Sequence, residues 1–241
     1  MSDNYLLLSC IRNKNINIKN NYANNCSLLA CKYNPDINIT KYLVEKCKMD
    51  INLKNNKNNN CLLLACGNNS NIDIIKYLVE DCKMDVNIKN DCNNNYLLLT
   101  CENNLNINII KYLVKDCKMN INVKNNKNNN CLLLACKNNL NNNIIRFLIE
   151  DCKIDINVKN NRENNCFLTS CKYNENINII KYFVETCKVD INLKNNHKNN
   201  CLILACLNNS NINIIKYLDE DLKIDIKLVN CRGQDCLIAA C

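Results

Sequence analysis

The sequence predicts an all-α solenoid of six whole 35-residue repeats, each made of two short helices and a finger hairpin, with a partial repeat at each end. Apolar segments that resemble CLLLAC begin at residues 26, 61, 96, 131, 166, 201 and 236, an unbroken spacing of 35. A second apolar pattern, such as NIDIIKYLVEDC, follows each of the first six segments at a fixed distance. With 2 Gly and 1 Pro, the chain lacks the turn residues on which β-sandwiches and barrels depend.

The first helix of each repeat is expected over the CLLLAC-like segment, for example from Cys61 to about Cys66. Asn60 stands directly in front of this segment. An asparagine side chain at this position accepts a hydrogen bond from the unpaired N–H groups of the first helical turn. Asn60 is therefore the expected N-cap of the helix.

The second helix of the same repeat is expected to begin after Asn71, with Asp73 where the helix dipole favours an anion. Its apolar stripe consists of Ile74, Ile75, Leu78 and Val79. Two helices of this size cannot bury their apolar faces alone. We therefore expect stacking between neighbouring repeats to supply most of the stability.

The finger of each repeat is expected in the segment between the second helix and the next first helix. Residues 50–53 alternate polar and apolar side chains, and an Asn-rich tip follows them. This pattern is typical of a strand-like hairpin that ends in a turn. Because asparagine tolerates positive φ better than most non-glycine residues, we expect many of the asparagines to replace glycine.

The repeats fill the chain, which predicts one solenoid over residues 1–241. It comprises a partial N-terminal repeat over 1–25, six whole repeats over 26–235 and a partial C-terminal repeat over 236–241. Asp219 stands where the other whole repeats have Val or Ile in the second helix. A buried unpaired carboxylate is costly, so Asp219 is expected to face solvent as part of a polar cap.

The chain has no apolar run of the length that a membrane helix needs, and its first residues lack the pattern of a signal peptide. We therefore expect a cytoplasmic protein. In that reducing compartment, the 21 cysteines are expected to be free thiols that pack as small apolar side chains.

These residues resemble the ankyrin repeat, whose pattern is a T-P-L-H-x-A-A helix, an I-V-x-x-L-L helix and G-A-D-V-N before the finger. Leu62 and Ala65 match the first helix, and residues 85–87 match D-V-N. Ile74, Ile75, Leu78 and Val79 match the second helix. The sequence departs from the pattern where Asn60 and Cys61 replace T-P, where Leu63 replaces His, and in repeats two residues longer than the usual 33.

The Asn-, Ile- and Lys-rich form of these repeats resembles the divergent ankyrin repeats of giant viruses of amoebae, and also those of A/T-rich amoebae. The resemblance implies a non-catalytic scaffold that binds a host or viral protein with its fingers and the inner face of its first helices. For a viral protein, the implied location is the host cytoplasm.

The expected fingers are basic. The net charges of the seven finger windows, which begin at residue 19 and recur every 35 residues, add up to +8, the net charge of the whole chain. An acidic partner would be steered to this edge. Alternatively, these side chains only keep an Asn-rich surface soluble. The candidate finger residues are Lys54, Lys57, Lys89, Lys124, Lys127, Lys159, Arg162, Lys194, His197 and Lys198.

The inner face of the first helices is the second candidate surface, since an exposed row of leucines would form a binding patch. The alternative is that a shift of one residue places these leucines in the core. The candidate inner-face residues are Leu29, Lys32, Tyr33, Leu64, Asn68, Leu99, Asn103, Leu134, Lys137, Asn138, Thr169, Lys172, Tyr173, Leu204 and Asn208.

No motif indicates catalysis or a cofactor. The Cys-x4-Cys pairs lack the spacing of a tetrahedral zinc site, and no phosphate-binding glycine motif is present. His197 and Cys201 form the one His/Cys pair that is close in sequence, but His197 occupies a variable finger position. We therefore expect no metal, no cofactor and no catalytic residue.

Two other functions stay open. Nucleic acid or another anionic surface could bind the basic edge, although the fingers have almost no aromatic residues for base stacking. The apolar terminal helices could also stack on other copies, so the oligomeric state is open.

Overall fold

The computed structural model describes residues 19–138 and 140–240, so most of the expected partial repeat over 1–25 lies outside the described residues. The contacts divide the chain into two compact halves, residues 1–120 and 121–241. The single solenoid over residues 1–241 stays a prediction.

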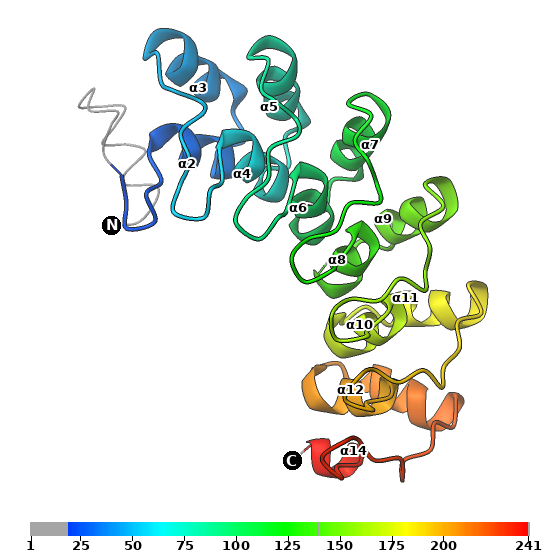
Figure 1. Ribbon diagram of the computed structural model, residues 1–241. Helices are drawn as coiled ribbons and strands as arrows, with labels where there is room; N and C mark the ends of the chain where they lie inside the picture. The colour runs from blue at the N-terminus through cyan, green and yellow to red at the C-terminus, as the bar shows by residue number, and fades with distance from the viewer. Residues whose placement is uncertain (1–18, 139, 241) are drawn as a thin grey trace. The chain divides into compact units, whose positions relative to one another are not determined.

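The N-terminal half contains two rows of helices (Figure 1). The first helices α2, α4 and α6 pack in sequence, and the second helices α3, α5 and α7 follow the same order. The bounds are α2 Cys26–Tyr33, α3 Ile37–Lys41 with the π-helical turn η1 Tyr42–Lys46, α4 Cys61–Asn68, α5 Ile72–Lys76 with η2 Tyr77–Asp81, α6 Tyr96–Asn103 and α7 Ile107–Lys115.

The C-terminal half repeats this arrangement, and its first helices α8, α10, α12 and α14 pack in sequence. The bounds are α8 Cys131–Asn138, α9 Asn142–Arg146 with η3 Phe147–Asp151, α10 Cys166–Tyr173, α11 Ile177–Lys181 with η4 Tyr182–Thr186, α12 Cys201–Asn208, α13 Ile212–Lys216 with η5 Tyr217–Asp221, and α14 Cys236–Ala240. Residues 19–138 and 140–240 contain no strand, so the predicted all-α class is confirmed and the strand-like finger is wrong.

The predicted helix caps are confirmed. Asn60 Oδ1 accepts a hydrogen bond from Leu63 N at 2.9 Å, and Asn71 Oδ1 accepts one from Asp73 N at 2.9 Å. The apolar stripe of the second helix packs as expected, since Ile74, Ile75 and Leu78 are fully buried. Asp219 is exposed, as its charge predicts.

Asparagine replaces glycine at only some of the positions with positive φ. It does so in the finger tips at Asn58, Asn93 and Asn128. At the ends of the second helices the residue with positive φ is instead a lysine, namely Lys48, Lys83, Lys118, Lys153, Lys188 and Lys223. There the following backbone N–H caps the helix, as Met84 N does by donating to Leu78 O at 3.1 Å.

Tyrosines of the second helices connect neighbouring repeats. Tyr77 OH donates to Glu45 Oε1 of the preceding repeat at 3.0 Å, and Lys41 Nζ lies 5.2 Å from the Tyr77 ring centroid. The same hydrogen bond joins Tyr112 to Glu80, Tyr182 to Glu150 and Tyr217 to Glu185. Burial, together with the partner carboxylate, raises the pKa of these phenols, that of Tyr217 to about 12.

We expect these tyrosines to make the fold sensitive to alkali. The folded state favours the neutral phenol, so its stabilisation is complete below the ordinary tyrosine pKa of about 10 and is lost as the pH rises through the raised values. The urea concentration at the midpoint of unfolding should therefore decrease as the pH rises from 9 to about 12. In a variant with Phe at positions 77, 112, 182 and 217, the fall should be shallower, because only the other titrating groups remain. Equal slopes for the two proteins would contradict this prediction.

Candidate protein-binding surface

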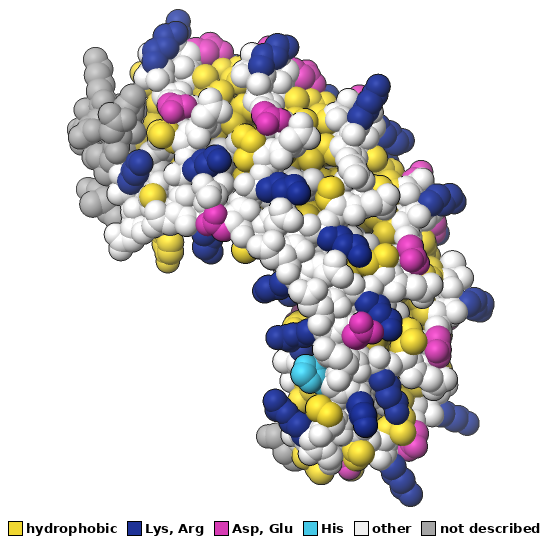
Figure 2. Space-filling view, viewed as in Figure 1, with side chains coloured by type: hydrophobic (Ala, Val, Ile, Leu, Met, Phe, Trp, Pro, Cys, Tyr) yellow, Lys and Arg dark blue, Asp and Glu magenta, His cyan; other side chains and the backbone are white. Residues whose placement is uncertain are grey.

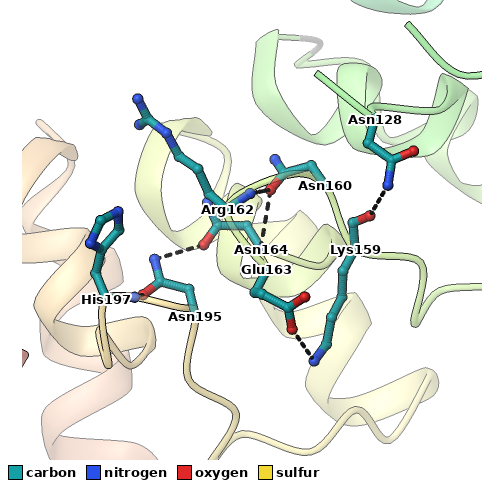
Figure 3. A network of polar contacts seen from close by, with 8 residues as sticks. All are labelled: Asn128, Lys159, Asn160, Arg162, Glu163, Asn164, Asn195 and His197. Carbon is teal, nitrogen blue, oxygen red and sulfur yellow. Dashed lines mark hydrogen bonds and ion pairs between the residues drawn. The ribbon is translucent and has the colours of Figure 1, made fainter. Parts of the chain in front are cut away.

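The fingers are organised by asparagine side chains, and Figure 3 shows the backbone N–H groups that donate to Asn160. Asn160 Oδ1 accepts from the backbone N–H groups of Arg162 at 2.9 Å and Asn164 at 3.2 Å. Its Nδ2 donates to Asn129 Oδ1 in the preceding finger at 3.1 Å. These bonds replace the expected strand pairing, because the side chain satisfies the backbone donors of the turn.

The tips of successive fingers are also joined through their backbones. In the C-terminal half, Asn161 N donates to Lys127 O at 3.1 Å, Asn196 N to Arg162 O at 3.3 Å and Cys231 N to His197 O at 2.9 Å. In the N-terminal half, Asn56 N donates to Tyr22 O and Asp91 N to Lys57 O in the same way. The fingers within each half therefore form a connected edge.

The side chains of all ten candidate finger residues are exposed, as predicted. They are Lys54, Lys57, Lys89, Lys124, Lys127, Lys159, Arg162, Lys194, His197 and Lys198. Figure 2 shows Lys and Arg side chains around the one histidine of the described surface. Lys159 forms an ion pair with Glu163 at 3.0 Å, and its charge is therefore partly neutralised (Figure 3).

The exposed ends of the first helices carry two tyrosines beside lysines. Tyr33 is 49% exposed, and Lys32 Nζ lies 4.4 Å from its ring centroid and donates to its hydroxyl at 2.6 Å. Tyr173 is 38% exposed, with Lys172 Nζ at 4.8 Å and Lys137 Nζ of the preceding repeat at 5.9 Å from its ring centroid. The candidate asparagines at these helix ends, Asn68, Asn103, Asn138 and Asn208, are exposed.

The expected exposed row of leucines is wrong, and the alternative that places it in the core is right. Leu29, Leu134 and Leu204 are each 1% exposed, Leu64 is 6% and Thr169 is 4% exposed, while Leu99 is half-buried. The physical reason is that the first helices pack against one another, as α4 does between α2 and α6 and as α10 does between α8 and α12.

A family model described as ankyrin repeats (3 copies) matches residues 3–90 and 69–160, which together are more than half of the chain. The chain belongs to the ankyrin-repeat family. It is also similar to a solved structure described as the Bd0816 predatory endopeptidase from Bdellovibrio bacteriovorus in complex with the immunity protein Bd3460. The identity is 20%, the TM-score is 0.61, and the match covers 84% of this chain and 99% of that chain. At this identity the likeness shows the fold alone. The comparison with curated proteins finds no significant match.

Sequence reasoning missed an apolar residue in the last whole ankyrin repeat. Leu207 is exposed and lines a cavity of about 150 Å³ beside the finger-tip residues His197 and Arg232. The sequence does distinguish Leu207, because no other whole repeat has a large apolar residue at this position. The matching residues are Lys32, Gly67, Glu102, Lys137 and Lys172. The cavity is lined by His197, Asn199, Leu207, Asn230, Cys231, Arg232 and Gln234.

The cysteines of the ankyrin repeats serve mainly as packing residues. Most are free thiols, whereas Cys26 is disulfide-bonded, contrary to the expectation that all are free. Burial is the largest factor that raises the pKa of the Cys66 and Cys206 thiols, to about 11 for Cys206. A thiol with a raised pKa is a weak nucleophile at neutral pH.

No group of three or more His, Cys, Asp or Glu residues that could hold a metal ion occurs in the described residues. No helix over residues 19–138 and 140–240 has the length and apolar character needed to cross a bilayer.

Proposed function

We propose that this ankyrin-repeat chain is a non-catalytic scaffold that binds a protein partner with its fingers and the exposed ends of its first helices. The observation that carries the proposal is the pairing of exposed tyrosines with lysines at Tyr33 and Tyr173. Tyrosine offers a large contact area with little loss of conformational freedom, and such residues dominate the energetics of protein interfaces.

The charge of the fingers favours an acidic partner. The ten finger residues named above are exposed, and the fingers are connected within each half, which should raise the association rate of a negatively charged surface. Exposed charges are screened by salt, so this contribution acts mainly on the rate of association and on the choice of partner.

The proposal extends to the setting in which the scaffold acts. The Asn-, Ile- and Lys-rich composition supports a giant-virus or amoebal source, with a host or viral protein as the partner and the host cytoplasm as the location. The even spacing of the repeats supports one solenoid over residues 1–241.

Affinity capture from infected or native cell lysate tests the proposal with the intact chain and two charge-reversal variants. The finger variant changes six exposed finger lysines to Glu: Lys54, Lys57, Lys124, Lys127, Lys194 and Lys198. The matched control changes the six exposed lysines at the ends of the second helices: Lys48, Lys83, Lys118, Lys153, Lys188 and Lys223. Both variants undergo the same change in net charge.

A defined protein retained by the intact chain and by the control, but lost by the finger variant, is the expected result. Retention of nucleic acid alone, lost at about 200 mM salt, would favour binding to an anionic polymer instead. Equal loss of the protein in both variants would show that net charge alone governs binding, and the finger surface would be the wrong site.

Self-association is a second candidate function, favoured by the last helix. Leu237 and Ile238 of α14 are 66% and 54% exposed, whereas the matching residues Leu202 and Ile203 of α12 are each 1% exposed. α12 itself packs between α10 and α14. Sedimentation equilibrium over a range of concentrations tests this function. A mass that rises with concentration, and that Leu237→Glu returns to one chain, is expected if copies pair through α14.

A further inference from the structure

Four basic side chains occupy equivalent tip positions in the C-terminal half. Lys127, Arg162, His197 and Arg232 are spaced 35 residues apart and are all exposed. We refer to them as the basic row. At the same positions the N-terminal half has Tyr22, Lys57 and Cys92. The continuous row of basic residues is therefore a property of the C-terminal half.

The backbone of the basic row is held in place at every tip. The carbonyl groups of Lys127, Arg162 and His197 each accept a hydrogen bond from the next finger. Within each finger, an asparagine side chain accepts from the N–H of the row residue, as Asn195 does from His197 at 3.0 Å and Asn230 from Arg232 at 2.8 Å. The row thus presents its side chains from a fixed backbone, which lowers the entropy lost on binding.

Acidic side chains of these fingers are already engaged. The finger windows of the C-terminal half, 124–130, 159–165, 194–200 and 229–235, contain the acids Glu163 and Asp235. Glu163 forms the ion pair with Lys159, and Asp235 Oδ1 accepts from Ile238 N at 2.9 Å at the start of α14. The basic row can therefore interact with carboxylates from outside the chain.

The cavity beside the row adds an apolar contact. Its lining combines His197 and Arg232 of the row with Leu207 from the end of α12. At about 150 Å³, it has room for one aliphatic side chain next to the two basic groups. A ligand with an acidic residue followed by an apolar one matches this combination.

The spacing of the repeats identifies the form of the ligand. Neighbouring packed helices lie about 8 to 10 Å apart, and a peptide in the polyproline II conformation rises about 3.1 Å per residue with three residues per turn. Every third residue of such a peptide therefore lies on the same side and advances by about one repeat. The row itself contains no Phe, Tyr or Trp on which nucleic-acid bases could stack, which favours a peptide over a single-stranded nucleic acid.

We propose that the C-terminal half binds an acidic peptide in the polyproline II conformation with a carboxylate at every third residue, one for each member of the basic row, and with an aliphatic residue at the cavity near Leu207. This proposal rests on the proposed scaffold function and names the chemistry of the segment that the scaffold holds. It commits to an acidic segment of a protein as the partner.

Fluorescence anisotropy with the full chain and synthetic peptides tests this inference. The first peptide has four Glu residues, one at every third position, and ends with a Leu. The second has the same composition with the four Glu residues adjacent to one another. A labelled single-stranded oligodeoxythymidine is the third probe. We expect the spaced peptide to bind about tenfold more tightly than the clustered one, because net charge alone cannot distinguish them.

Two single substitutions identify the site. Arg162→Glu should weaken the binding of the spaced peptide by about tenfold, since it places a like charge in the middle of the row. Lys188→Glu, at an exposed position just after η4 in the same half, makes the same charge change away from the row and should leave the affinity within about twofold. Circular dichroism of both variants checks that the fold is retained.

Equal affinities for the two peptides, tighter binding of the oligodeoxythymidine, or equal effects of the two substitutions would each overturn the inference. The failure of the inference is distinguishable from that of the scaffold function. If a lysate protein depends on the fingers but the spaced peptide does not bind, the scaffold function stands and the peptide chemistry is wrong.

Discussion

Changing Asn104 to Asp should lower the free energy of unfolding by about 3 kcal/mol, although the two side chains have nearly the same shape. Asn104 is buried, and its Nδ2 donates to the carbonyl groups of Cys66 at 3.0 Å and Asn69 at 2.8 Å, both in the preceding repeat. A carboxylate loses both donors and places a negative charge against two carbonyl oxygens.

The pH dependence of Asn104→Asp provides a second test. Burial raises the pKa of the introduced carboxyl above its usual value of about 3.9, so the variant is most stable below that pH and loses stability as the pH rises through the raised value. Urea unfolding of the variant and the wild type at pH 4 and pH 7 measures this difference.

The matched control is Asn103→Asp, which makes the same change at the exposed neighbouring position. It should alter the free energy of unfolding by no more than about 0.5 kcal/mol. Similar losses for Asn103→Asp and Asn104→Asp would show that the bonds of Asn104 to the preceding repeat contribute little.

Changing Phe183 to Ala should have a comparable or larger effect, a loss of about 3 to 5 kcal/mol in the free energy of unfolding. Phe183 is fully buried in η4, and its ring packs at 6.1 Å from the ring of Tyr182. The other repeats have a leucine at this position: Leu43, Leu78, Leu113, Leu148 and Leu218. Truncation to alanine leaves a cavity that the neighbouring helices can fill only in part.

Two controls separate the cavity from other effects of Phe183→Ala. Phe183→Leu restores the residue of the other repeats and should cost less than about 1.5 kcal/mol. Tyr173→Ala removes an exposed aromatic side chain and should have a smaller effect on stability than the buried substitution. Chemical denaturation of the three variants provides the comparison. If Phe183→Leu were as harmful as Phe183→Ala, the ring itself and not the filled volume would be essential.

Local features of the sequence predicted the parts of the fold that depend on local contacts. Asn60 and Asn71 cap helices that begin one residue later, so both caps could be predicted from the adjacent residues in the sequence. The even spacing of the repeats predicted which segments become first and second helices. The exposure of the finger lysines could be predicted in the same way, because a charged residue in an Asn-rich loop has no apolar contact to make.

Contacts between repeats were harder to predict. Asn104 bonds to residues 35 and 38 positions earlier, and no local pattern shows which asparagine points toward the preceding repeat. The first helices are apolar on nearly all sides, so the sequence did not show that Leu134 and Leu204 lie in the core. The positive φ at Lys83 was also unpredicted, since lysine carries none of the usual signs of that conformation.

The hydrogen bonds that buried asparagine side chains make to the preceding repeat have a consequence for the ageing of the protein. Asparagine side chains hydrolyse slowly to aspartate, and asparagine is among the thermolabile residues that proteins of hot environments avoid. In this chain Asn69, Asn104 and Asn209 each hold the preceding repeat through amide donors. Each deamidation there converts two hydrogen bonds into two repulsions. Deamidation would thus weaken the contacts between repeats one pair of repeats at a time. Prolonged heating would inactivate the protein faster than reversible unfolding alone.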